Sequence, residues 1–350
     1  MSQPGHVSRT VLAVTWLLVG IAMVAAPAWV GWTRWEPVLN GHPALLVAAI
    51  GCLALGLIAI VWAIASLAVG DRADREDDRP GHARQRTAAQ MTRRAQLRIA
   101  LALPALMLAL VLTGLVAWAR PFPAGPEALA ASRSSDRIRV VDTLTWYEMT
   151  PTARNASGDL VPPKVGLVFV PGARVDPRAY APLMAPLVEA GNLVIVLKDP
   201  FGIALADPGH AGRAIAVHPE IAAWAVGGHS LGGTGASAFA DTDTRVKGLV
   251  LWASYPARAL TRTDLRVLSV FGSKDGLATP AEIERRKPDL PPDTQFVEIA
   301  GGTHAFFGDY GDQPGDGVAT ADKAAAQEQI VTATRDFLAG LAPPPPKKKK

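Results

Sequence analysis

Three long runs without a charged residue occupy the first third of the chain, at residues 11–30, 44–69 and 99–119. Each run is long enough to cross about 30 Å of hydrocarbon as a helix, and none shows the single apolar stripe of a helix on a soluble core. We therefore predict an anchor over residues 1–120 with three transmembrane helices. The first run has an alternative interpretation as a signal peptide cleaved after Ala26-Pro27-Ala28, which leaves the later two helices in the same orientation.

The distribution of arginine predicts how these helices are oriented. Residues 71–98, between the second and third runs, hold eight arginines, whereas the loop at residues 31–43 holds one. Basic loops stay in the cytoplasm, so residues 71–98 and the N-terminus should be cytoplasmic. The chain after residue 119 should then be outside. Four arginines soon after the third run count against this orientation. We predict a multi-pass protein of the cell membrane whose C-terminal domain is extracytoplasmic.

Charge and cysteine content exclude several classes of function. The formal net charge is +4, and four lysines end the chain, so the remainder sums to 4 − 4 = 0 and offers no basic field for a nucleic-acid partner. The single cysteine, Cys52, lies inside an apolar run, which excludes a disulfide framework, a cysteine-based zinc site and a thiol nucleophile. Residues 343–350, four prolines and four lysines, are predicted to be a disordered basic tail.

A second domain is predicted over residues 138–342, after a Pro-, Ala-, Gly- and Ser-rich stretch at residues 121–137 that is typical of a linker. Short runs that are almost wholly apolar alternate there with helix-like segments. Strands of this kind are buried on both faces, which indicates an α/β fold with a mostly parallel sheet between helices. The predicted strands are residues 165–170, 193–197, 224–226, 249–252, 267–271 and 296–299, and the clearest helices are residues 180–190 and 321–341.

The segment Gly228-His229-Ser230-Leu231-Gly232 fits the pattern G-x-S-x-G and follows a predicted strand. A serine on a sharp turn between strand and helix needs neighbours without a Cβ, so that the two elements approach each other and the hydroxyl stands clear. The pentapeptide alone is a weak indication, but its position inside an α/β sheet is the one that such a nucleophile requires. We predict Ser230 as a nucleophile.

A serine hydroxyl needs a base to accept its proton and a third group to orient that base. Asp275 and His304 each come just after a predicted strand, at the sheet edge where α/β enzymes place their catalytic groups. The order Ser230, Asp275, His304 is that of the α/β-hydrolase triad. We predict His304 as the general base and Asp275 as the acid that orients it.

Three further residues compete for these roles, and two loop histidines are considered for contact with substrate. Asp199 also follows a predicted strand, and Asp309 lies close to the histidine in sequence, so each is a rival acid. His229 is a weaker candidate for the base, because its Cβ direction on the turn is wrong for the neighbouring serine. His210 and His218 lie in a loop, where a solvent-facing position is more common than contact with substrate.

Acyl transfer also needs donors for the oxyanion of the tetrahedral intermediate. One donor should be the backbone N–H of Leu231 at the start of the helix. The second should come from the loop Pro171-Gly172-Ala173-Arg174, in which Gly172 permits the close approach and either Ala173 or Arg174 supplies the N–H.

At these residues the domain, from about residue 140 to residue 341, resembles the α/β-hydrolase superfamily, and specifically its small branch that is similar to dienelactone hydrolases. The motifs that carry this resemblance are the serine pentapeptide, the Pro171-Gly172 turn, Gly272-Ser-Lys-Asp275-Gly and Gly301-Gly-Thr-His304-Ala-Phe-Phe-Gly-Asp309. The resemblance implies a Ser/Asp/His hydrolase with no metal and no organic cofactor. Two departures stand out: dienelactone hydrolases have cysteine in place of Ser230, and relatives often have glycine in place of Ala173.

The dozen or so residues between the strands that end at residue 252 and begin at residue 267 leave no room for a helical cap, so the cleft should be open, with residues 199–218 as its only partial lid. We expect a membrane-anchored serine hydrolase acting on small or lipid-like carboxylic esters. Two different functions stay open: an acyltransferase with the same triad, and a non-catalytic, membrane-bound binding protein with a hydrolase fold.

Overall fold

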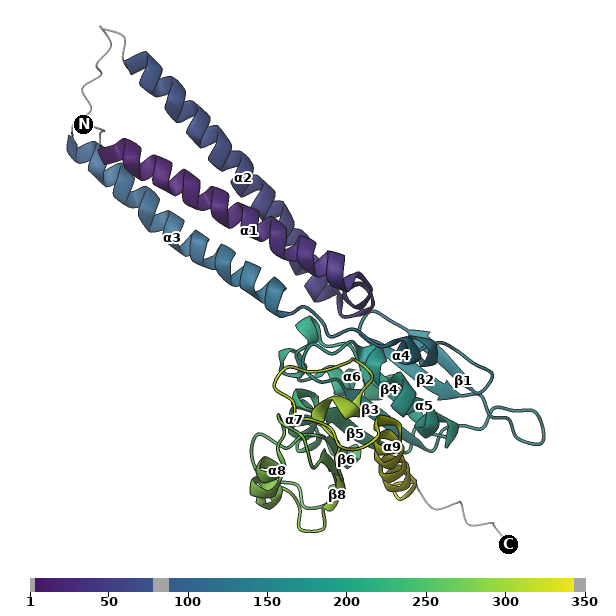
Figure 1. The fold of residues 1–350 in the computed structure, drawn as a ribbon. Coiled ribbons are helices and arrows are strands. Elements are labelled where there is room, and N and C mark those ends of the chain that lie inside the picture. Colours follow the sequence, from purple (N-terminus) through teal and green to yellow (C-terminus); the bar gives the residue numbers. More distant parts are fainter. Residues whose placement is uncertain (1–3, 78–87, 343–350) are drawn as a thin grey trace. The chain divides into compact units, whose positions relative to one another are not determined.

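The structure is a computed structural model that describes residues 4–77 and 88–342. The described residues form two compact units, one within residues 1–35 and 44–120 and the other within residues 36–43 and 121–350. Figure 1 shows long helices in the first unit and a sheet flanked by helices in the second. The predicted basic tail lies outside the described residues, as do residues 78–87 of the arginine-rich loop.

Among its described residues the first unit has three helices: α1 (Pro4–Asn40), α2 (Pro43–Asp77) and α3 (Ala88–Trp118). Each holds a segment long and apolar enough to cross a membrane, namely Thr10–Asn40, Pro43–Val69 and Ala100–Trp118. The loop expected at residues 31–43 is shorter than predicted, because α1 continues to Asn40 with a single break at Arg34 (φ −145°, ψ 35°).

Small residues bring α1 and α2 together. A Cβ on Gly20 would lie 2.9 Å from the carbonyl oxygen of Gly56, and a Cβ on Gly56 would lie 2.8 Å from the Cβ of Met23. Such close backbone approach is typical of helices that associate in lipid. Cys52 is fully buried at this contact, and its thiol lies 3.3 Å from the carbonyl oxygen of Met23, so it fills a packing position.

An eight-stranded sheet in the order β1-β2-β4-β3-β5-β6-β7-β8 forms the second unit. The antiparallel strands β1 and β2 lie at one edge, and all pairs from β4 onward are parallel. The strands are β1 (Ile138–Asp142), β2 (Trp146–Pro151), β3 (Val165–Val170), β4 (Leu193–Leu197), β5 (Ala223–His229), β6 (Val246–Trp252), β7 (Arg266–Gly272) and β8 (Gln295–Ile299). The predicted apolar runs are the parallel strands, whereas β1 and β2 were not predicted.

Helices cover both faces of this sheet because successive side chains of its strands point in opposite directions. Leu167 and Phe169 belong to one core cluster with residues of α5 (Ala181–Glu189) and α9 (Lys323–Ala339). Val168 and Val170 belong to a second cluster with residues of α6 (His210–Ala216) and α7 (Leu231–Ala240). The helices predicted at residues 180–190 and 321–341 are α5 and α9. Another helix, α8 (Pro280–Arg286), follows β7.

Residues 121–137, predicted to be a linker, belong to the second unit and pack against the rest of it. They contain the short helix α4 (Pro126–Ala131), whose Ala128 is fully buried. The N–H of Phe122 donates to the carbonyl of Arg174 (2.7 Å), and the N–H of Gly125 donates to the carbonyl of Asp309 (2.7 Å). The segment is therefore part of the folded domain, because its backbone finds partners that its composition does not reveal.

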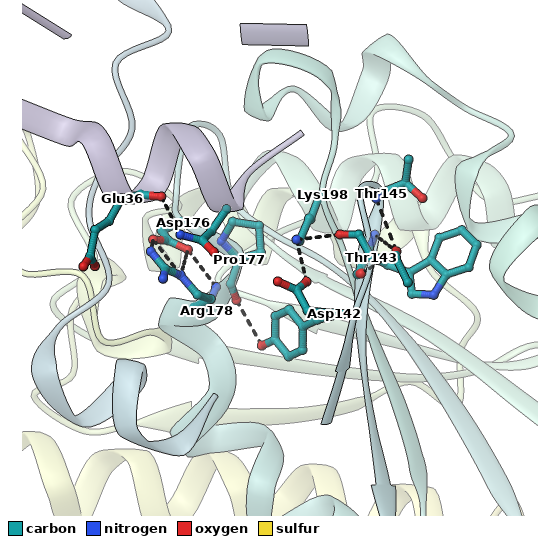
Figure 2. A network of polar contacts seen from close by, with 11 residues as sticks. Glu36, Asp142, Thr143, Thr145, Asp176, Pro177, Arg178 and Lys198 are labelled. Carbon is teal, nitrogen blue, oxygen red and sulfur yellow. Dashed lines mark hydrogen bonds and ion pairs between the residues drawn. The ribbon is translucent and has the colours of Figure 1, made fainter. Parts of the chain in front are cut away.

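The antiparallel edge is joined to the parallel sheet by a buried lysine, Lys198, which is 3% exposed and directly follows β4. Its ammonium forms an ion pair with Asp142 (2.5 Å) and donates to the carbonyl of Thr143 (2.7 Å), while its N–H donates to the carbonyl of Thr145 (2.7 Å), as Figure 2 shows. A buried ammonium needs such partners to offset its desolvation. This satisfied lysine has a structural role in the connection between β1, β2 and β4.

Candidate active site

Ser230 lies between β5 and α7 in a strained backbone conformation, with φ 53° and ψ −126°. A non-glycine residue held in such a region costs on the order of 1–3 kcal/mol, which the surrounding structure must offset. Two contacts hold this turn: the N–H of Ser230 donates to the carbonyl of Trp252 (3.0 Å), and the hydroxyl of Ser254 donates to the carbonyl of Ser230 (2.6 Å). The strand and helix predicted around the serine are both present.

The glycines beside the serine are required by close packing. A methyl group on Gly228 would overlap the backbone of Gly232, and one on Gly232 would overlap the carbonyl groups of Val170 and Pro171. Helix α7 therefore begins in direct contact with the end of β3. This contact is the mechanical reason for the glycine pattern.

Asp275 and His304 come together from the loops after β7 and β8. His304 is the first residue of the short helix η5 (His304–Phe307), and its Nδ1 lies 2.8 Å from Oδ2 of Asp275. His304 is 1% exposed and Asp275 is 3% exposed. The other oxygen, Oδ1 of Asp275, accepts from the N–H groups of Leu277 (2.8 Å) and Ala278 (2.7 Å). A buried carboxylate with these partners holds the imidazole proton on Nδ1, which leaves Nε2 as an acceptor.

Ser230 and His304 line one cavity of about 220 Å³. The remaining residues that line it are Leu231, Thr234, Ala253, Ser254, Tyr255, Leu277 and Ala278. Nε2 of His304 is buried and has no hydrogen-bond partner among the described residues, so it is not bonded to the serine hydroxyl in this conformation. Catalytic hydrogen bonds are often long in ligand-free enzymes and tighten when substrate binds.

The loop after β3 shows which backbone N–H groups are engaged. The N–H of Gly172 donates to the hydroxyl of Tyr180 (2.8 Å), and the N–H of Arg174 donates to the carbonyl of Gly202 (2.9 Å). Within residues 88–342, no hydrogen bond engages the N–H of Ala173 or of Leu231. Gly172 therefore does not serve as a donor itself, and its role is to provide space, since a Cβ there would lie 2.7 Å from Nδ1 of His229.

Comparison with known proteins agrees with this architecture. Residues 166–328 match the model of the alpha/beta hydrolase family. The C-terminal domain has the α/β-hydrolase fold. The match includes Ser230, Asp275 and His304, and it supports hydrolase activity in general. No curated protein matches the chain.

His229, the neighbour of the serine in the hydrolase domain, is fully buried and does not line the cavity of Ser230. Its Nδ1 lies 2.9 Å from the hydroxyl of Tyr180, and its ring lies 4.5 Å from that of His304. Burial and the nearby charge of His304 hold the pKa of His229 well below its ordinary value of 6.5, partly opposed by the His304 backbone. Nδ1 of His229 contacts Tyr180 rather than an acid that would orient the ring. His229 therefore does not fit the role of general base.

The rival acids and the two loop histidines have partners of their own in the hydrolase domain. Asp199 pairs with His210 (Oδ1 to Nδ1, 2.9 Å), and Asp309 accepts from Lys323 (3.1 Å) and from the N–H of Ala128. His218 contacts two glutamates. None of residues 199–218 lines the cavity of Ser230, so the expected partial lid is not observed there. Several of these residues pack instead against the core beside α7.

One carboxylate that the sequence did not single out contacts both loops of the Asp275–His304 pair. Asp316 accepts hydrogen bonds from the backbone N–H groups of Gly276, His304 and Ala305. It stands in Gly315-Asp316-Gly317, which fits no catalytic motif. Two flanking glycines were the sole indication that this loop makes a close approach to another segment.

Proposed function

We propose that this protein is a membrane-anchored serine hydrolase that cleaves carboxylic esters through Ser230, His304 and Asp275. The observation that carries the proposal is the buried Asp275–His304 pair beside Ser230. Nε2 of His304 has no hydrogen-bond partner among the described residues, and His304 lines the same cavity as Ser230, which lies on a strained turn. Strain of this kind persists where the surrounding structure holds it for a function.

Acylation begins when the hydroxyl of Ser230 attacks the ester carbonyl carbon and its proton passes to Nε2 of His304. Asp275 stabilises the resulting imidazolium through the Nδ1 hydrogen bond. The carbonyl oxygen becomes an oxyanion, for which the N–H groups of Leu231 and Ala173, unengaged within residues 88–342, are the donors. When the tetrahedral intermediate collapses, the C–O bond to the alcohol breaks and His304 returns its proton to the leaving oxygen.

Deacylation repeats these steps with water. His304 accepts a proton from a water molecule, the hydroxide attacks the acyl carbon, and the bond to the Ser230 oxygen breaks. The proton returns to that oxygen, which releases a carboxylic acid and regenerates the enzyme. An alcohol in place of water would give acyl transfer by the same residues.

The lining of the cavity favours a small, uncharged ester. His304 is the sole titratable nitrogen or carboxyl side chain among its nine lining residues, so no ion pair would hold a charged substrate. The cavity of about 220 Å³ is large enough for a small acyl or alkyl group beside Ser230. The resemblance of the domain to dienelactone hydrolases, which the sequence motifs indicate, is also part of this proposal.

The three apolar helices support membrane association and are proposed to be the anchor. The arginine-rich segment between α2 and α3 would then be cytoplasmic and the hydrolase domain extracytoplasmic. With Cys52 replaced by serine, labelling of single cysteines placed at Gly41 and in the hydrolase domain by a membrane-impermeant reagent on intact cells tests this orientation. Labelling at both positions is expected, and protection of both contradicts it.

Hydrolysis of p-nitrophenyl acetate by the purified full chain tests the function. Ser230→Ala should lower kcat by about 10⁴-fold or more while the circular dichroism spectrum stays unchanged, because the hydroxyls of Thr234 and Ser254, which also line the cavity, donate to backbone carbonyl groups. Ser157→Ala, which changes an exposed serine, is the control. Equal activity of Ser230→Ala and wild type contradicts the assignment.

A further inference from the structure

The loop between η5 and α9 contributes one carboxylate, Asp316, that accepts four backbone hydrogen bonds. Its Oδ1 accepts from Gly276 (3.1 Å), His304 (3.1 Å) and Gly317 (2.7 Å), and its Oδ2 accepts from Ala305 (2.9 Å). A carboxylate that accepts several N–H bonds makes charge-assisted contacts, which are stronger than those between neutral groups.

These donors belong to the two loops that hold the acid and the base. Gly276 directly follows Asp275, and two more of the donors are His304 itself and the residue after it. Direct bonds between the loops, such as Ser273 Oγ accepting from Gly301 (2.8 Å), lie before the two side chains in sequence. Asp316 therefore fixes the part of each loop from which the Asp275 and His304 side chains project.

Close packing restricts movement of the Asp316 loop. A Cβ on Gly276 would lie 2.7 Å from the carbonyl oxygen of Gly315, and one on Gly317 would overlap the carbonyl oxygen of Lys274.

Burial would raise the pKa of Asp316, but the N–H groups of Ala305, Gly276, His304 and Gly317 lower it, so the side chain is a carboxylate at neutral pH.

We propose that Asp316 is a positioning residue for ester hydrolysis, which sets the distance and orientation between Asp275 and His304 by binding the backbone of both loops. This role rests on the proposed function. A displacement of about 1 Å in a catalytic group costs as much as 100-fold in rate, so a clamp on two loops has a measurable effect on turnover.

Asp316→Asn tests this role because it keeps the size of the side chain but replaces one acceptor oxygen with an NH₂ group and removes the charge. We expect kcat for p-nitrophenyl acetate to fall about 10- to 100-fold with KM changed by less than about 2-fold, since the cavity that binds substrate is intact. Asp316→Glu, which retains the carboxylate, should recover part of the loss. Asp312→Asn changes an exposed aspartate of the same loop and is the matched control, with wild-type kcat expected.

The pH profile gives a second readout, which a purely structural role would not move. The ionisable groups around His304 are Asp275, His229, Tyr310 and Asp316. Loss of the Asp316 charge and of the fixed Asp275 contact makes the imidazolium less stable, so the acidic limb of kcat/KM should move to lower pH in Asp316→Asn.

The outcomes distinguish the positioning role from the function on which it rests. An active wild type with kcat of Asp316→Asn within about 2-fold of it and an unmoved acidic limb overturns the positioning role alone. Wild-type protein that hydrolyses no ester overturns both. If Asp316→Asn is unfolded at the assay temperature by circular dichroism, Asp316→Glu decides: folded protein with lowered kcat supports positioning, and an unfolded protein shows a structural role instead.

Discussion

Two aspartate–histidine pairs lie in the hydrolase domain, each with its aspartate just after a parallel strand. Asp275 and His304 are 2.8 Å apart, and Asp199 and His210 are 2.9 Å apart. All four residues are less than 8% exposed, and in both histidines the buried Nε2 has no hydrogen-bond partner within the described part of the chain. By pair geometry alone, the two resemble each other closely.

The cavities beside the pairs differ. His304 shares its cavity with Ser230, whereas His210 lines a cavity of about 170 Å³ whose sole hydroxyl belongs to Thr242, and that hydroxyl donates to the carbonyl of Phe239 (3.0 Å). Asp275 is also held by two backbone N–H groups, and no such donors contact the Asp199 carboxylate among the described residues. A buried Asp–His pair therefore does not by itself distinguish the candidate active site, and the strained serine beside it does.

Replacing each acid by its amide should separate the two pairs most strongly. Asp275→Asn should lower kcat by about 10⁴-fold, because an amide no longer holds the imidazole in the required tautomer. Asp199→Asn should leave kcat within about 2-fold and lower the free energy of unfolding by about 1–3 kcal/mol, since it weakens one buried hydrogen bond. Ester hydrolysis and urea unfolding of the full chain in detergent measure both. Equal loss of activity in the two variants would remove the distinction.

A methyl group added to Gly172, in the loop after β3, should lower the activity of Ser230 less than Asp275→Asn does. In Gly172→Ala the added Cβ would lie 2.7 Å from Nδ1 of His229 and 3.2 Å from the hydroxyl of Tyr180, so the loop that carries the Ala173 N–H must move. We expect kcat/KM to fall about 10- to 100-fold. Gly51→Ala, at a glycine with no atom within 4 Å of an added Cβ, is the control and should behave as wild type.

The smallest expected effect is that of His229 on how the free energy of unfolding depends on pH. Its pKa is held below the ordinary 6.5, so at pH values below 6.5 the unfolded chain binds a proton that the folded domain does not. Its contribution to stability is thus complete above pH 6.5 and decreases as the pH falls toward the lowered pKa, by up to about 1.4 kcal/mol per pH unit.

His229→Gln cannot titrate in this range, so its free energy of unfolding should fall less steeply between about pH 6.5 and 5 than that of wild type. Urea unfolding at several pH values measures the two slopes. Identical slopes would show that His229 is protonated in the folded domain as readily as in the unfolded chain.

Much of the parallel sheet was predictable because its strands are apolar on both faces. The predicted strands at residues 165–170 and 193–197 have the observed bounds of β3 and β4. The edge strands β1 and β2 were missed, since charged residues interrupt them and neither is the continuous apolar run that marks the parallel strands. The residue types and order of Ser230, Asp275 and His304 identified the candidate site, because each residue stands at a strand end.

Features that depend on a distant segment were not predictable. Asp316 binds Gly276 from 40 residues away, and nothing in its neighbours specifies that contact. Residues 121–137 have the composition of a linker, yet their backbone finds partners in segments that follow much later in the chain. The choice among the N–H groups of the loop after β3 likewise depended on the positions of Tyr180 and Gly202.

Labelling of the full chain by a fluorophosphonate, with the modified peptide identified by mass spectrometry, tests most directly whether Ser230 is activated by His304. Wild type and His210→Gln should be labelled at Ser230, and His304→Gln should lose the label, because His304 is the histidine that lines the cavity of that serine. The same substitution at both histidines keeps the size of the change matched. Labelling that survives in His304→Gln, or a folded wild type that is not labelled, would contradict the assignment of this site.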